Sequence, residues 1–130
     1  MRRITRNPLL FCQGGFSEWA DYLAHIAECY CGIAVDQRYT LGRYALDFAA
    51  LERPLICGNT AINRKLFPDL ICHYYDLDKQ AELLNQIYYD EEFYANCVAK
   101  AQIGLQDYTH SACRQLYSEA LRRAGYAGEI

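Results

Sequence analysis

Two short apolar runs separated by one helical segment constrain the fold of this chain more than any other feature. The first run, "CYCGIAVD" at 29–36, is rich in β-branched and aromatic residues and ends in an acid, which is typical of a buried strand. The second, "RPLICG" at 53–58, has Pro54 at its start and Gly58 at its end, and strands tolerate both positions. Residues 42–51 between them predict a helix. Strand, helix and strand in this order predict a parallel sheet with a helical crossover.

The flanking segments predict one more short strand and several helices. Ser17 is a suitable N-cap, and apolar residues at helical spacing follow it to about residue 27. "NTAINRKLFPDL" at 59–70 predicts a short helix or turn closed by Pro68, and "LICHYYD" at 70–76 predicts a short strand. Three longer helices follow, and we expect their caps to be Asp78, Asp90 and either Asp107 or Thr109. The last helix carries its apolar residues on one face: Ala112, Cys113, Leu116, Tyr117, Ala120 and Leu121.

The length and the order of these segments define the expected fold class. A chain of 130 residues is large enough to bury one core and too small for two, so we expect residues 1–130 to form a single domain. We predict an α/β fold, namely a Rossmann-like three-layer domain with a small, mostly parallel sheet. Helices should cover both faces of that sheet, and the C-terminal part should be helical.

Charge and hydropathy exclude two classes of function. The formal net charge is −3 and no basic field is present, which argues against a nucleic-acid-binding protein. The apolar run "PLLFC" at 8–12 is too short for the core of a signal peptide or for a membrane span. We therefore expect a cytoplasmic protein without a membrane span.

Seven cysteines allow two interpretations. Their number is odd and most lie in apolar runs, which favours buried free thiols at Cys29, Cys31, Cys57, Cys72 and Cys97. The alternative is a metal site in which Cys29 and Cys31 act with His25, or Cys72 acts with His73. No pair has the two-residue gap of a zinc knuckle, so we expect no metal.

Twelve tyrosines are spread over every segment, and four of them form adjacent pairs: Tyr74, Tyr75, Tyr88 and Tyr89. Such residues could be stacking platforms for sugars or bases. Their even spread instead favours packing at the edge of the core, where the ring is buried and the hydroxyl reaches water.

The carboxyl ends of the two predicted parallel strands carry the candidate binding site. Ligands of parallel sheets sit at this edge, and the two loops that meet there contain Asp36, Arg38, Tyr39, Thr40, Gly58, Asn59 and Thr60. The helix entered through Gly42 directs free backbone N–H groups and the positive end of its dipole at the same place. Arg38 and Arg43 add donors suited to phosphate oxygens. The pattern predicts a site for a nucleotide or a nucleotide-sugar diphosphate.

Asp47 lies one helical turn beyond Arg43 and also allows two interpretations. It could accept hydrogen bonds from ribose hydroxyls, as acids commonly do in nucleotide sites. It could instead form an i,i+4 ion pair with Arg43. The rest of this helix is apolar on most sides, so a buried acid there needs a partner, which favours a binding role.

The segment "YTLGRYALDFAALERPLICGNT" at 39–60 resembles the donor-binding region of retaining, glycogen-synthase-like glycosyltransferases of the GT-B fold. In that family a Glu, seven residues and a second Glu precede a small-residue helix, a Pro and an apolar strand. "FSEWADYLAHIAECYCGIAV" at 16–35 is similar to the helix and strand before this motif. "LFPDLICHYYDLDKQAELLNQIYYDEEFYANC" at 66–97 is similar to the segment after it. The resemblance covers about residues 14–125.

The resemblance implies a role for several residues. Thr40, Leu41, Gly42 and Arg43 would hold the donor diphosphate together with Arg38, and Asp47 would bind the ribose in place of the family's second Glu. Tyr39 stands where the family has its first Glu, on the side of the donor sugar, where Asp36, Asn59 and Thr60 also lie. The donor would be a UDP-, GDP- or ADP-sugar, bound without a metal or another cofactor.

The resemblance also implies what the chain would need for catalysis. The strand, the Gly-rich loop and the acceptor domain that precede this region in the family do not fit before Gly14. We therefore expect a partial donor-binding domain that is incomplete as a catalyst alone, so its catalytic residues are not assigned. An acceptor-domain partner chain or a homodimer would complete it. Two alternatives are a non-catalytic interaction or assembly module and a different nucleotide-binding α/β enzyme.

Overall fold

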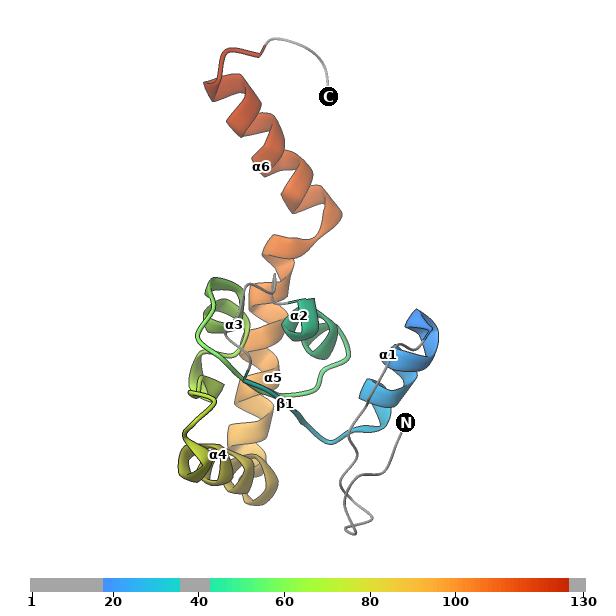
Figure 1. Ribbon diagram of the computed structural model, residues 1–130. Helices are drawn as coiled ribbons and strands as arrows, with labels where there is room; N and C mark the ends of the chain where they lie inside the picture. The colour runs from blue at the N-terminus through green and yellow to red at the C-terminus, as the bar shows by residue number, and fades with distance from the viewer. Residues whose placement is uncertain (1–17, 36–42, 127–130) are drawn as a thin grey trace.

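The computed structural model describes residues 18–35 and 43–126 of the chain (Figure 1). In this part, two strands and six α-helices alternate as predicted in the first half, and helices fill the second half. The bounds are α1 Trp19–Glu28, β1 Gly32–Ala34, α2 Arg43–Ala50, β2 Leu55–Cys57, α3 Ala61–Leu66, α4 Leu77–Tyr89, α5 Glu91–Leu105 and α6 His110–Arg123. Two short 3-10 helices, η1 Pro68–Leu70 and η2 Gln106–Tyr108, connect them.

The predicted strand–helix–strand unit is confirmed. β1 and β2 are parallel, with Gly32 opposite Leu55, and α2 is the crossover between them. The backbone N–H of Gly32 donates to the carbonyl of Pro54 at 2.9 Å. A side chain at Gly32 would meet the ring of Phe48 at 2.4 Å, so glycine allows α2 to pack closely on β1.

The sheet is smaller than expected. The strand predicted at 70–76 is reduced to one parallel bridge, between Ile71 and Cys57, and the backbone then turns at Tyr74 and Tyr75. The sheet of the described residues therefore has two strands, and the coarse α/β class is confirmed. The three-layer Rossmann-like arrangement stays a prediction.

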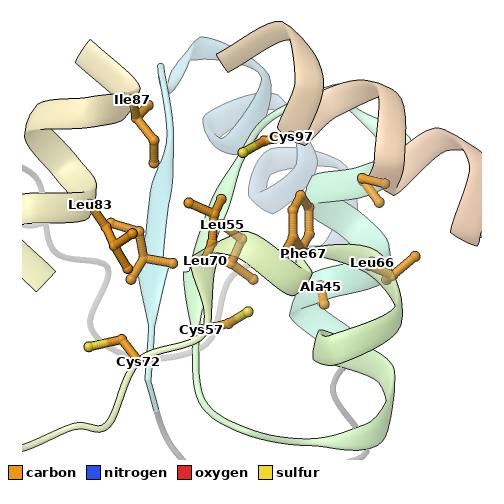
Figure 2. Packing of buried hydrophobic residues seen from close by; sticks show 13 residues of the cluster. Ala45, Leu55, Cys57, Leu66, Phe67, Leu70, Cys72, Leu83, Ile87 and Cys97 are labelled. Atoms are coloured by element: carbon orange, nitrogen blue, oxygen red, sulfur yellow. The ribbon is translucent and has the colours of Figure 1, made fainter. Parts of the chain in front are cut away.

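The core lies between β2, α2 and the helices of the second half (Figure 2). All three residues of β2 are buried, since helices cover this strand, and the apolar run that predicted it carries no alternation. α5 is the central helix of the domain and packs against α2, α3 and α4. The side chains that form the core together with β2 include Leu66, Phe67, Leu70, Leu83, Ile87 and Cys97.

Side-chain caps begin the helices of the second half. Asp90 caps α5 by accepting from the N–H of Phe93 at 2.9 Å, and Thr109 caps α6. The prediction that Asp78 caps α4 is wrong, because Asp76 accepts from the N–H of Lys79 at 2.9 Å and starts the helix earlier. Asp78 lies inside the first turn, where the helix dipole still favours a carboxylate.

α6 runs away from the rest of the domain (Figure 1). None of its residues is buried, and Leu116 and Tyr117 on its apolar face are 61% and 70% exposed. The apolar face predicted from the sequence is therefore largely exposed within the described residues.

The cysteines of the described residues are all free thiols. Cys57, Cys72 and Cys97 are buried as predicted, whereas Cys29 and Cys31 are only partly buried. Burial raises the pKa of the Cys57 thiol to about 12. Within residues 18–35 and 43–126 no three potential ligands come together to hold a metal ion. Every helix in these same ranges is too short or too polar to cross a lipid bilayer.

Candidate functional site

The predicted site falls only partly within the described residues. Asp36, Arg38, Tyr39, Thr40, Leu41 and Gly42 lie outside them. Arg43, Asp47, Asn59 and Thr60 lie inside them, on α2 and on the loop after β2. Because β1 and β2 are parallel, the chain leaves both strands at the same edge of the sheet, as the binding hypothesis requires.

The loop after β2 is held by its own hydrogen bonds. Thr60 caps α3, since its Oγ1 accepts from the N–H of Asn63 at 3.2 Å. The amide of Asn63, only 5% exposed, donates to the carbonyl of Gly58 at 2.7 Å. The Oδ1 atom of Asn59 accepts from Arg64 at 2.6 Å. The structure thus gives Asn59 and Thr60 structural partners on α3.

Arg43 is the first residue of α2, and its side chain is exposed. Its guanidinium lies over the indole ring of Trp19, 4.4 Å from the ring centre. A cation above the face of an indole is attracted by the negative charge of that face. This contact orients the guanidinium and links the start of α2 to α1.

Asp47 is buried, with 9% of its surface exposed, and its partner is Tyr22 of α1. The hydroxyl of Tyr22 donates to Oδ2 of Asp47 at 3.2 Å. Burial raises the pKa of Asp47, and the Tyr22 hydrogen bond and the charge of Arg43 oppose that rise. Burial and the neighbouring carboxylate likewise raise the pKa of Tyr22. The acid therefore has the partner that its burial demands, and this partner is a hydroxyl.

Trp19 and Tyr22 are parts of this site that sequence reasoning missed. Their rings pack together at 5.6 Å on one face of α1, and Tyr22 also contacts the ring of Tyr44 on α2. The spacing of three residues that joins Trp19 and Tyr22 is visible in the sequence and places both rings on one face of the predicted helix. The signal that could have identified them is a pair of aromatic residues on one helix and a single acid in the next, otherwise apolar helix.

The two charged side chains of α2 determine what kind of ligand this site could bind. One cation and one buried carboxylate stand a turn apart on a helix whose first residue lies at the carboxyl edge of two parallel strands. The guanidinium of Arg43 suits an anionic ligand, and the carboxylate of Asp47 already accepts a hydrogen bond from the hydroxyl of Tyr22.

Comparison of the chain with known protein families, with curated proteins and with solved structures found no significant match. The similarity to glycosyltransferases therefore stays a prediction from the motifs of the sequence.

Proposed function

We propose that this chain binds the diphosphate and ribose of a nucleotide sugar, in the manner of a glycosyltransferase donor domain. Arg43 would contact the diphosphate and Asp47 the ribose hydroxyls. Arg38, Thr40, Leu41 and Gly42 of the preceding loop would complete the anion site, and Asp36, Tyr39, Asn59 and Thr60 would lie toward the sugar. Glycosyl transfer would need further protein that supplies the acceptor site.

The observation that carries the proposal is the hydrogen bond from Tyr22 to Asp47. A buried carboxylate that accepts from a phenol hydroxyl has the environment in which it could accept from a ribose hydroxyl. It stands one turn from the start of α2, where backbone N–H groups and Arg43 favour phosphate. This spacing along α2 would suit a ligand that has an anionic group next to a diol.

Ligand binding by Asp47 would require an exchange of partners. The ribose hydroxyl would take the place of the Tyr22 hydroxyl, and the guanidinium of Arg43 would turn from Trp19 toward phosphate. Both contacts belong to α1, so a shift of this helix would accompany binding. Donor binding should therefore change the environment of Trp19, the only tryptophan of the chain.

An amide-shift titration of the full chain tests the proposal. UDP, GDP, ADP and their glucose or mannose conjugates would be added, and the signals of Arg43, Asp47 and Asn59 followed. We expect saturable shifts at Arg43 and Asp47 together with a change in Trp19 fluorescence. Arg43→Ala should weaken binding about tenfold, because it removes a charge-assisted hydrogen bond.

The matched control is Arg122→Ala, which removes an exposed arginine from α6. This variant should bind as the unmodified chain does. No shift with any of the ligands at millimolar concentration, or an equal loss in both variants, would contradict donor binding at this edge. Tight binding of a dinucleotide without binding of a sugar nucleotide would favour a different nucleotide-binding enzyme.

A second candidate function, that of an assembly module, is favoured by α6. This helix exposes Leu116 and Tyr117 and buries none of its residues, although isolated helices of this length are marginal in water. A second copy of the chain could cover its apolar face and form a homodimer. Light scattering would show a dimer that Leu116→Glu converts to monomer, and a monomer at high concentration would count against it.

A further inference from the structure

A turn with three consecutive aromatic rings lies at the same edge of the sheet as the candidate donor site. Ile71 pairs with Cys57 in the parallel direction, and the N–H of Cys72 donates to the carbonyl of Cys57 at 2.9 Å. Residues 73–76 therefore leave the sheet at the edge where the chain also leaves β1 and β2. The rings of His73, Tyr74 and Tyr75 stand on this turn.

Hydrogen bonds hold the turn in one conformation. The side-chain amide of Gln80 donates to the carbonyls of both His73 and Tyr74 at 3.2 Å. The N–H of Asp76 donates to the carbonyl of His73 at 3.0 Å, and the N–H of Tyr75 donates to Nδ1 of the His73 ring at 3.3 Å. Because Nδ1 accepts, the ring carries its proton on Nε2, which is a donor.

The three rings contact one another and remain open to solvent. The ring centres of Tyr74 and Tyr75 are 3.6 Å apart, and the His73 ring stacks on Tyr74 at 4.9 Å. Tyr74 and Tyr75 are 45% and 72% exposed, so the expectation that they pack at the edge of the core is wrong. A fixed cluster of exposed aromatic faces is a surface on which a flat ligand can stack.

Two other tyrosines illustrate how this surface differs from a packing contact. The rings of Tyr30 and Tyr94 also meet, at 4.8 Å, but their hydroxyls donate to the backbone carbonyls of Ile87 and Tyr30. These hydrogen bonds join the segment before β1 to α4 and α5, so that pair has a structural role. The bonds that fix the 73–76 turn are made by its backbone, by the His73 ring and by the side chain of Gln80, and the Tyr74 and Tyr75 side chains remain exposed.

The charges near the turn favour a neutral ligand. Asp76 ends the turn, Asp78 lies two residues beyond it, and the ammonium group of Lys79 is paired with Glu82 at 2.9 Å. Two nearby carboxylates disfavour a phosphate or another anion. Hydroxyl-bearing sugar rings have an apolar C–H face for stacking and donors and acceptors around it, which suits the tyrosine rings and the His73 Nε2–H.

We propose that Tyr74 and Tyr75, together with His73, form a stacking site for a ring of a neutral oligosaccharide. The proposal of carbohydrate binding rests on the geometry of the turn and on the charges beside it, and it is independent of the donor site. Its assignment as the site for the carbohydrate substrate of glycosyl transfer rests on the function proposed above.

A titration with three neutral oligosaccharides, maltohexaose, cellohexaose and mannohexaose, tests the site on the full chain. Ring and amide signals of His73, Tyr74 and Tyr75 should shift in a saturable way with at least one of them at millimolar concentration. Tyr74→Ala/Tyr75→Ala should weaken binding about tenfold or more, because two ring contacts are lost. Both side chains are exposed, so the variant keeps its core.

The adjacent pair at the other end of α4 provides the control. Tyr88 and Tyr89 are 65% and 80% exposed and their rings also touch, so Tyr88→Ala/Tyr89→Ala removes the same chemistry elsewhere. This variant should bind the sugar normally. Shifts spread evenly over all exposed tyrosines, no binding of any of the three sugars, or binding of an aromatic peptide alone would overturn the proposal. Sugar binding without nucleotide binding at Arg43 would support this site and contradict the donor site.

Discussion

The hydroxyl of Tyr22 and the carboxylate of Asp47, 25 positions apart in the chain, form the hydrogen bond that fastens α1 to α2. The contact of Trp19 with Arg43 and the hydrogen bond from Arg53 to the carbonyl of Ala27, 2.8 Å long, lie along the same interface. These contacts decide how α1 is held, because Ile26 is the only buried residue of this helix.

Tyr22→Phe should destabilise the protein by about 1–3 kcal/mol, because it leaves a buried carboxylate without its hydroxyl donor. Urea unfolding followed by circular dichroism measures this loss. Tyr117→Phe, which removes a hydroxyl from the exposed face of α6, should change the unfolding free energy by less than about 0.5 kcal/mol. Equal effects of the two substitutions would mean that the Tyr22 hydroxyl contributes nothing to the free energy of unfolding.

Asp47→Asn should alter the pH dependence of stability. Burial raises the pKa of Asp47 in the folded protein above its ordinary value of 3.8, so the folded state binds more protons than the unfolded state. The stability from this group is present below the ordinary pKa and is lost as pH rises through the folded pKa. The asparagine variant lacks this loss and can still accept from Tyr22. Its stability relative to the unmodified protein should therefore be higher at about pH 7 than at about pH 3.5.

Urea midpoints at the two pH values check this expectation. Asp78→Asn is the matched control, since Asp78 is an exposed acid in the first turn of α4. Its charge is favourable there, so its replacement should not give a gain at neutral pH. A stability difference for Asp47→Asn that falls as pH rises would show that the folded state favours the charged carboxylate.

Gly104→Ala should destabilise the α3–α5 contact. A methyl group at this position would lie 2.8 Å from the carbonyl oxygen of Lys65 and 3.2 Å from a methyl of Leu66. Because the first of these is backbone, α5 must shift away, and we expect a loss of about 1–3 kcal/mol in thermal or urea unfolding. Ile103→Ala, at the neighbouring exposed position, is the comparison and should cost less than about 0.5 kcal/mol. An unchanged free energy of unfolding for Gly104→Ala would show that α5 can shift away from α3 without cost.

Thr109→Ala should loosen α6 while the rest of the fold keeps its stability. Thr109 accepts from the N–H of Ala112 at 3.3 Å, and loss of such a cap costs a helix about 1 kcal/mol. Since α6 buries no residue, the amides of α6 should exchange faster while those of α5 stay protected. Hydrogen exchange by mass spectrometry measures the two helices separately.

Ser118→Ala, which removes a hydrogen bond to the carbonyl of Arg114 inside α6, is the control and should leave this exchange pattern unchanged. Faster exchange throughout the domain would show that α6 supports the core.

The parts of the fold that the sequence predicted are those with a strong local signal. β1, α2 and β2 lie where their apolar runs and Pro54 indicated, and Asp90 caps its helix as expected. Apolar periodicity reports which face of a segment is apolar, but not whether another element covers that face. For this reason the exposure of α6, and the exposure of Tyr74 and Tyr75, could not be predicted.

The candidate site was less predictable than the fold. The sequence predicts Arg43 and Asp47 from their spacing along a helix, and both lie in the first two turns of α2. Their partners come from α1, and only a tertiary contact reveals that Trp19 and Tyr22 face them. The cap of α4 shows the same limit on a smaller scale, because both Asp76 and Asp78 suit a cap and the backbone of the preceding turn decides between them.

The central position of α5 has a consequence for the order in which the protein can fold during synthesis. The side chain of Gln102 on α5 donates to the carbonyl of Ala49 on α2, which precedes it by 53 residues. α2 and α3 leave the ribosome before α5, yet α5, which packs against both, is translated last among the elements of the core. The nascent first half therefore exposes the apolar faces of α2 and α3 until residues 91–105 emerge, and in that interval the chain is most prone to aggregate.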